Sequence, residues 1–172
     1  WLIADVVPDT RAFLWARTEP DEQLLALLKD PQWMPWLVFP ADETVAGQRV
    51  EPELPVELQH STRRPLFVLL DGTWQEARKM FRKSPYLQQL PVLSLQPQRL
   101  STYHLRNAPG AGQLSTAEVA IECLRQADDQ PAAQALLDWF NRFNRHYLAV
   151  KTPLSPEQAQ ALLNPDAETR QA

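Results

Sequence analysis

One carboxylate in this sequence follows an apolar run with the pattern of a buried strand. In LFVLLDGTWQEARKM, residues 66–80, five apolar residues lead directly into Asp71. In an open α/β sheet the ligand crevice lies beyond the carboxyl ends of the strands, and Asp71 stands at such an end, beside the start of a helix. A functional role at this crevice is therefore one explanation of Asp71. A helix-capping role is the alternative, since Asp often caps helices; we favour the functional role.

The residues after Asp71 have an adequate structural explanation. Thr73 and Glu76 have the spacing of a capping box, in which a hydroxyl and a carboxylate satisfy backbone donors at the start of a helix. Gly72 fits the tight turn from strand to helix. The apolar residues of the helix recur on one face, as core residues do. That face comprises Trp74, Ala77, Met80 and Phe81.

The opposite face of this helix carries four cations with no acidic residue at i+4. An ordinary solvated face and a binding site for an anionic polymer both fit this pattern. The chain has a net charge of -4, yet residues 61–110 hold eight of the 17 Lys and Arg and two of the 21 acidic residues. This segment is therefore the part of the chain that would meet an anionic polymer. The four cations are Arg78, Lys79, Arg82 and Lys83.

A second candidate loop lies in YHLRNAPGAGQLSTAEVAIECL, residues 103–124. Ser115 and Glu118 have capping-box spacing, and a loop that ends in helix N–H groups can receive a carboxylate or a phosphate. Glycines allow a ligand to approach the backbone closely. Three of the four glycines lie in the two candidate loops: Gly72, Gly110 and Gly112.

Three side chains before this loop have two explanations each. Arg106 suits a bidentate grip on a carboxylate or phosphate, although a surface Arg commonly pairs locally. Tyr103 and His104 could stack on a base, or could form a half-buried aromatic pair. Both explanations stay open for each residue.

These residues are positioned by alternating strands and helices, which predict one α/β domain over residues 1–162 with a mostly parallel sheet flanked by helices. Residues 41–64 are expected to form an exposed loop, and residues 163–172 a C-terminal tail. We expect strands at 2–7, 36–40, 66–70 and 92–95, and helices at 21–29, 74–83, 116–126 and 131–148.

Composition narrows the class of protein. The chain is 44% hydrophobic and 22% charged, as globular proteins are, and no apolar run approaches the roughly 20 residues of a membrane span. A single cysteine, Cys123, excludes an internal disulfide and predicts a small buried thiol. We expect a soluble cytoplasmic protein whose first segment precedes Trp1. Phosphate-loop, dinucleotide-binding, zinc-peptidase and serine-hydrolase motifs do not occur in the sequence.

The motifs DGTW, YHLR and LSTAEVA together resemble the DTW-domain family over most of the chain, from LIADVVPDT to about residue 150. The resemblance implies a tRNA-uridine aminocarboxypropyltransferase related to the SPOUT superfamily. Such an enzyme transfers the 3-amino-3-carboxypropyl group of S-adenosylmethionine to N3 of a uridine. A SPOUT-like fold with a C-terminal trefoil knot is also implied. The family usually carries a Cys-rich segment before the position where this chain starts, and we expect no metal site within the chain.

The resemblance, together with the residue pattern, assigns roles. Asp71 is expected to handle the N3 proton. Thr116 and Glu118 match the family motif and have a purely structural role as an alternative. We expect the donor to be bound by Gly72, Thr73, Arg106, Gly110, Gly112, Leu114, Ser115, Thr116 and Glu118, and tRNA by Arg78, Lys79, Arg82, Lys83, Tyr103 and His104.

Two other functions fit the same sequence. A SPOUT-type RNA methyltransferase would use the same donor and transfer a different group. A non-catalytic RNA-binding module would keep the scaffold and lack donor binding. The released product separates the first from an aminocarboxypropyltransferase, and donor binding separates the second.

Overall fold

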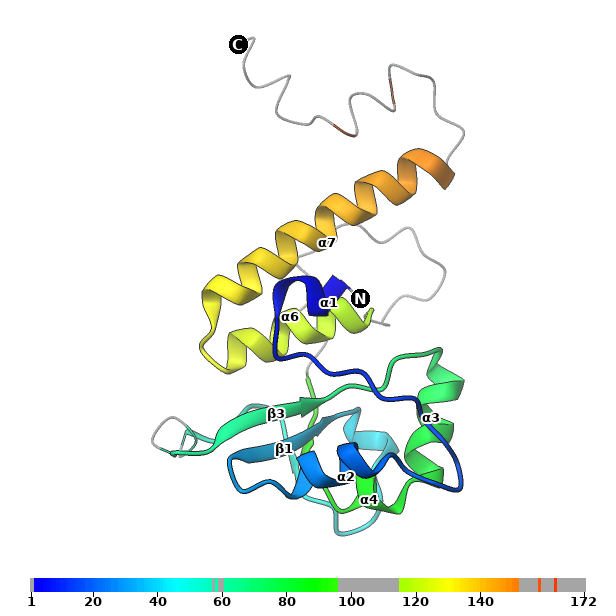
Figure 1. The fold of residues 1–172 in the computed structure, drawn as a ribbon, viewed down its shortest axis with the longest axis vertical. Coiled ribbons are helices and arrows are strands. Elements are labelled where there is room, and N and C mark those ends of the chain that lie inside the picture. Colours follow the sequence, from blue (N-terminus) through cyan, green and yellow to red (C-terminus); the bar gives the residue numbers. More distant parts are fainter. Residues whose placement is uncertain are drawn as a thin grey trace.

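The described part of the chain is built around a parallel sheet. A computed structural model describes residues 2–56, 58, 61–95, 115–151, 158 and 163. Within these residues the sheet has four strands in the order β2-β4-β1-β3, all parallel. Figure 1 shows the two longest, β1 and β3, side by side. The expected parallel α/β architecture is confirmed. The strands are β1 Trp33–Val38, β2 Val50–Glu51, β3 Arg64–Val68 and β4 Val92–Leu93.

The central strand β1 holds a proline, and the register explains why it is tolerated. Leu37 N–H donates to the carbonyl of Pro91, so the backbone N–H groups of the odd-numbered residues of β1 point toward β4. Pro35 lies two residues earlier on that same side, where β4 has not yet begun, because β4 pairs only with Leu37 and Val38. The missing N–H therefore removes no ladder bond.

Alternate residues of β1 enter two different cores. Leu37 packs with Phe81 and Val92 under α2 (Glu22–Lys29), α3 (Trp74–Lys83) and α4 (Pro85–Gln88). Trp36 points the other way and packs with Cys123 of α6 (Thr116–Gln126). Helices therefore cover both faces of the sheet, as a buried parallel sheet requires.

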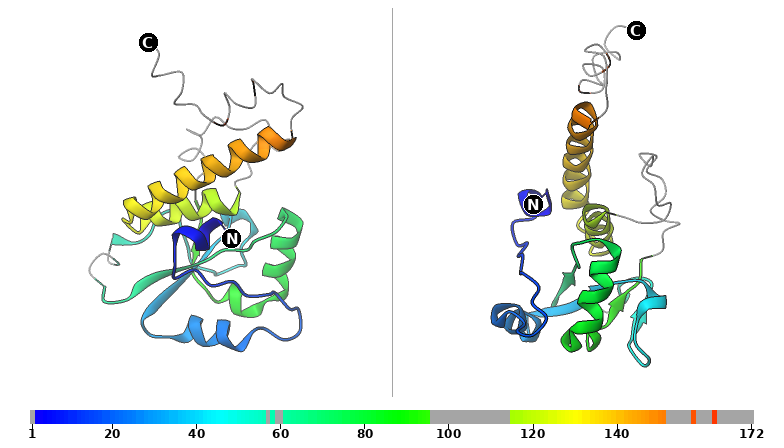
Figure 2. Two further views of the ribbon diagram at one scale, coloured as in Figure 1. Left: turned by 45° about the horizontal axis from the view of Figure 1, so that its top comes forward. Right: turned by 90° about the vertical axis from the view of Figure 1, so that its right-hand side faces the viewer.

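A third layer of helices lies outside α6. The helix α7 (Gln130–Lys151) follows α6 after a short turn in which Asp128 has a positive φ of 61°. Leu136 of α7 is fully buried against Ala120 and Ile121 of α6. Figure 2 shows α6 between the sheet and α7, with the N-terminal helix packed beside them. Within the described residues, no helix is both long and apolar enough to cross a membrane.

Three features differ from the sequence-based expectations. The strand expected at 2–7 is wrong, because Leu2–Val6 forms the helix α1. Ile3 and Val6 both pack on the core of α6 and α7; a strand would point them to opposite faces, whereas a helix places i and i+3 together. The expected exposed loop at 41–64 is wrong in part, because it contains the 3-10 helix η1 (Ala41–Glu43), β2 and the start of β3. The helix α4 was not expected.

The remaining helices lie where the periodicity predicts them. α3 and α6 have the expected bounds, and α7 starts one residue earlier than expected. Both α3 and α6 begin at complete capping boxes, on Thr73 with Glu76 and on Ser115 with Glu118. Short-range side-chain to backbone bonds of this kind are set locally, which is why sequence alone locates these helix starts.

Candidate functional site

The carboxyl end of β3 and the start of α6 meet at one hydrogen bond. Thr116 Oγ1 donates to Asp71 Oδ1 at 2.6 Å, across 45 residues of sequence. Asp71 is exposed, and no other described residue donates to its carboxylate. It follows β3 by three residues, at the sheet edge where a ligand crevice is expected. Asp71 therefore presents an oriented, solvent-accessible carboxylate, which is the requirement for proton transfer with a bound substrate.

The two capping boxes place two helix N-termini beside this carboxylate. Thr73 backbone N–H and hydroxyl both donate to Glu76 Oε2 at 2.7 Å, and Ser115 donates to Glu118 Oε2 in the same way at 2.8 and 2.9 Å. The hydroxyl of Thr73, followed by its N–H, holds the pKa of Glu76 below its ordinary value. Both glutamates thus serve as capping groups at the starts of α3 and α6. Of the acidic residues at this edge between 71 and 76, only Asp71 keeps its carboxylate outside a cap.

Gly72 has a steric reason to be a glycine. A Cβ at this position would lie 3.2 Å from Cβ and from Oε2 of Glu76. That separation is tighter than ordinary van der Waals contact, so a larger residue would push on the capping carboxylate. Gly72 therefore lets the chain turn closely past Glu76 between Asp71 and Thr73.

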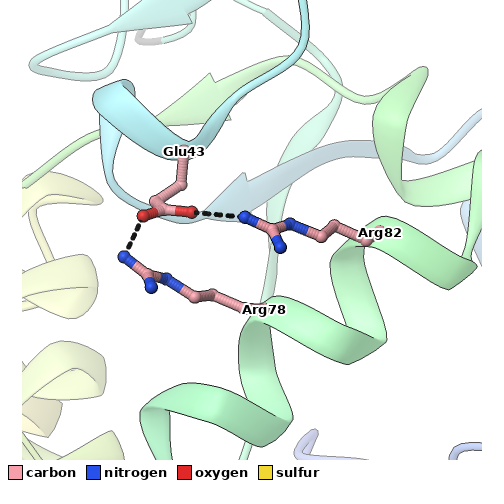
Figure 3. A network of polar contacts seen from close by, with 3 residues as sticks. All are labelled: Glu43, Arg78 and Arg82. Carbon is pink, nitrogen blue, oxygen red and sulfur yellow. Dashed lines mark hydrogen bonds and ion pairs between the residues drawn. The ribbon is translucent and has the colours of Figure 1, made fainter.

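A carboxylate from a neighbouring strand end joins two of the predicted RNA-binding arginines. Glu43, in η1 directly after β1, is hydrogen-bonded to Arg78 Nη2 and forms an ion pair with Arg82 Nη2 at 3.6 Å (Figure 3). The Glu43 side chain is only 12% exposed, whereas Arg82 is 67% exposed. The interpretation of the α3 face as four unpaired cations is therefore wrong for these two arginines. Their acidic partner comes from another element, outside the helix spacing that sequence can test.

The guanidinium group of Arg78 lies over an aromatic ring. Its guanidinium carbon lies 5.1 Å from the centre of the Trp74 ring, and Trp74 stacks on Phe39 at 5.5 Å. Planar guanidinium groups bind well over such rings. Trp74 thus packs partly against the core, as predicted, and also carries a cation on its outer face.

The other two cations of α3 face solvent. Lys79 and Lys83 are exposed, and the Lys79 ammonium lies 5.9 Å from the Trp15 ring. Among the described residues neither lysine forms an ion pair with a carboxylate. Among the described residues, α3 therefore carries two cations that pair with Glu43 and two that pair with no carboxylate.

Glu43 is the residue at this edge that sequence analysis missed. It lay within the segment expected to be an exposed loop, and its partners are 35 and 39 residues away. The signal that could have found it is its position in FPADE, directly after the apolar run of β1, which parallels Asp71 after β3.

Six predicted site residues fall outside the described part of the chain. They are Tyr103, His104, Arg106, Gly110, Gly112 and Leu114. Where they lie relative to Asp71 stays a prediction.

Other features of the described residues bear less directly on this site. No group of three or more His, Cys, Asp or Glu is arranged to hold a metal ion in the parts of the chain that the structure describes. A hollow lined by residues 45–49 and 88–91 lies where β2 and β4 begin, at the opposite edge of the sheet from Asp71. The candidate site is therefore the carboxyl end of the sheet, which holds Asp71, Thr116 and Glu43 with its two arginines.

Comparison with known proteins gives three findings. The family model described as DTW domain matches residues 1–148. A protein of Drosophila melanogaster named tRNA-uridine aminocarboxypropyltransferase 2 is 32% identical over 114 residues, which are 66% of this chain and 41% of that protein. This chain thus matches less than half the length of that relative. No solved structure matches the chain.

Proposed function

Since the chain belongs to the DTW domain family, we propose that it modifies tRNA as an aminocarboxypropyltransferase. In this proposal S-adenosylmethionine donates its 3-amino-3-carboxypropyl group to N3 of a uridine, and methylthioadenosine is released. The observation that carries the proposal is the exposed Asp71 carboxylate, oriented by Thr116 at the carboxyl edge of a parallel sheet. The name of the fly relative supports the reaction type.

The proposed reaction needs one proton acceptor. The N3–H of uridine is a weakly acidic imide, and Asp71 would accept or orient its proton while N3 forms a bond to the γ-carbon of the donor. The C–S bond breaks, and its electron pair returns to the sulfonium sulfur, which becomes a neutral thioether. Charge is balanced without a covalent enzyme intermediate.

Positioning would decide which carbon next to sulfur is transferred. In the proposal, the carboxylate of the donor lies at the N-terminus of α6, near Thr116, because helix N-termini favour anions. Arg106, with the glycine loop before Ser115, would complete this grip. Thr116 then has two tasks, since its hydroxyl already holds Asp71.

The tRNA backbone would lie along α3. Lys79 and Lys83 are exposed there, and Arg82 keeps two thirds of its side chain accessible. Binding through such cations weakens steeply with salt. We also propose that the C-terminal part forms a SPOUT-like knot. The enzyme would bind RNA and act in the cytoplasm.

The decisive experiment incubates the protein with S-adenosylmethionine and unmodified tRNA, followed by mass spectrometry of the nucleosides. We expect a uridine heavier by one aminocarboxypropyl group and an equal amount of methylthioadenosine. S-adenosylhomocysteine with a methylated nucleoside would identify a methyltransferase instead. Failure of calorimetry to detect donor binding would favour a non-catalytic RNA-binding module.

A further inference from the structure

The second half of α7 carries an exposed stripe of aromatic side chains, which we call the α7 stripe. Trp139, Phe143 and Tyr147 are 36%, 48% and 50% exposed. Among the described residues, these three are the exposed large aromatic side chains. They recur at i, i+4 and i+8, so they lie on one face of the helix. Phe143 and Tyr147 stack on each other with ring centres 6.2 Å apart. Exposed aromatic rows of this kind mark interaction surfaces.

Two basic side chains share this face. Arg142 and His146 fall within the same arc of about 140° when each residue turns the helix by 100°, and both are exposed. The Arg142 guanidinium carbon lies 5.7 Å from the centre of the Trp139 ring. Residues 139–147 contain no Asp or Glu. At the first end of the stripe Asp5 of α1 accepts the Trp139 indole N–H at 3.2 Å, and Asp138 directly precedes Trp139 in the sequence.

The α7 stripe lies on the half of α7 that runs toward the start of α6, which is the end of α6 at the candidate site. Phe140 packs with Ala120 and Ile121 of α6, and α7 runs back along α6. At the same rise per residue in both helices, Phe143 is near the level of the start of α6 and Tyr147 lies beyond it; Thr116, at that start, meets Asp71. Figure 1 shows the second half of α7 continuing past the start of α6 and pointing away from the sheet.

We infer, on the premise of the proposed function, that the α7 stripe binds unpaired bases of the RNA substrate. Aromatic rings interleaved with cations are the chemistry that recognises single-stranded nucleic acid, because bases stack on the rings and phosphates meet the cations. The stripe spans about 12 Å from Trp139 to Tyr147, which accommodates roughly three stacked bases. The positive charge favours RNA over a purely apolar partner. A second copy of the chain, the competing occupant, would bring the same cations face to face.

The test compares binding of a 12-nucleotide oligouridylate with binding of an RNA duplex of equal length, by fluorescence anisotropy. We expect the single strand to bind more tightly than the duplex. The double variant Phe143→Ala, Tyr147→Ala should lose about 30-fold or more in single-strand affinity, with circular dichroism unchanged. The ring-preserving variant Phe143→Tyr, Tyr147→Phe should stay within about two-fold of the unaltered chain. Leu14→Ala, at a side chain that is 93% exposed, is the matched surface control.

Two results would overturn the inference. One is equal affinity of the alanine variant and the unaltered chain for the single strand. The other is a dimer in analytical ultracentrifugation that the alanine variant dissociates while RNA affinity is unchanged, which would make the stripe a self-association surface. Transfer to tRNA is assayed separately. Normal turnover with unaltered RNA binding in the alanine variant would reject this inference alone, whereas stripe-dependent binding without any transfer would reject the proposed function alone.

Discussion

Asp71 and Thr116 are joined by a 2.6 Å hydrogen bond that connects the end of β3 to the first residue of α6. The bond orients one carboxylate oxygen and leaves the group exposed to solvent. The bond also connects the sheet to α6, near the N-termini of α3 and α6. Several consequences for activity and stability can be measured.

Asp71→Asn should preserve the fold and donor binding and lower turnover by about 100-fold or more, because general-base catalysis contributes 10²–10⁴-fold. Asn still accepts the Thr116 hydrogen bond, so the geometry is kept and only the basicity is lost. Turnover is followed by methylthioadenosine release, and donor affinity by calorimetry. Asp42→Asn, at an exposed carboxylate of η1, is the control. Full turnover in Asp71→Asn would remove Asp71 from the mechanism.

Thr116→Val should lower turnover by about ten-fold, less than Asp71→Asn does, because the carboxylate remains but loses its donor. Thr116→Ser retains a hydroxyl and should recover most of the activity. A change in the pH profile of turnover would distinguish an effect on Asp71 from a loss of folding, which thermal denaturation reports independently. If Val and Ser variants behaved alike, the hydroxyl would have no role.

Glu43→Gln should strengthen RNA binding and weaken the fold slightly. The carboxylate offsets the charges of Arg78 and Arg82, and its removal exposes them to phosphate. We expect a several-fold gain in tRNA affinity with a salt dependence steeper by about one phosphate contact. The stability loss in urea should be about 1 kcal/mol, since Arg82 is 67% and Arg78 40% exposed and solvent weakens ion pairs of exposed groups. Arg82→Gln should act in the opposite direction on RNA. Unchanged affinity in both variants would make this face an ordinary solvated one.

The Thr73 and Glu76 capping box should make stability depend on acid pH. Its hydrogen bonds lower the pKa of Glu76 below the ordinary value of 4.5 in the folded chain. The unfolded state therefore binds the proton more readily, so this contribution is full above about pH 4.5 and is lost as the pH falls through the folded pKa. The Tm difference between the unaltered chain and Glu76→Gln should shrink below pH 4.5. Gln75→Ala, at an exposed side chain that does not titrate, is the control and should show no such trend.

Cys123 should be unreactive in the folded protein. The thiol is 1% exposed, and burial raises its pKa well above the ordinary range. Because the thiolate is the reactive species, a disulfide reagent should label it slowly under native conditions and completely in denaturant. Labelling at the rate of a free thiol in the native chain would show that the core around Trp36 opens readily.

Local signals were sufficient to locate α3, α6 and Asp71. Capping boxes and helical periodicity involve neighbours within four residues, so the sequence displays them directly. β2 is two residues long and exists because its residues pair with β4; no local pattern identifies such a strand. α1 was predicted as a strand because its apolar run is short, and only its packing on α6 and α7 reveals the helical period.

The same limit applies to the site. The position of Asp71 at a strand end is a local property, whereas its partner Thr116 is 45 residues away. Likewise, Arg78 and Arg82 looked unpaired within their helix, and Glu43 reached them from the end of another strand. Contacts between strand ends depend on strand order, which propensity and spacing do not specify.

The register of the parallel sheet also implies an order of assembly. β1 pairs with β3 across 31 residues, from Trp33 to Arg64, and with β4 across 55, from Leu37 to Val92. Closing such long loops is slow because entropy is lost before contacts form. The carboxyl edge exists only after both pairings, and Thr116 can dock on Asp71 only after that. We therefore expect the two residues that complete the site to come together late in folding, after the sheet on which they depend.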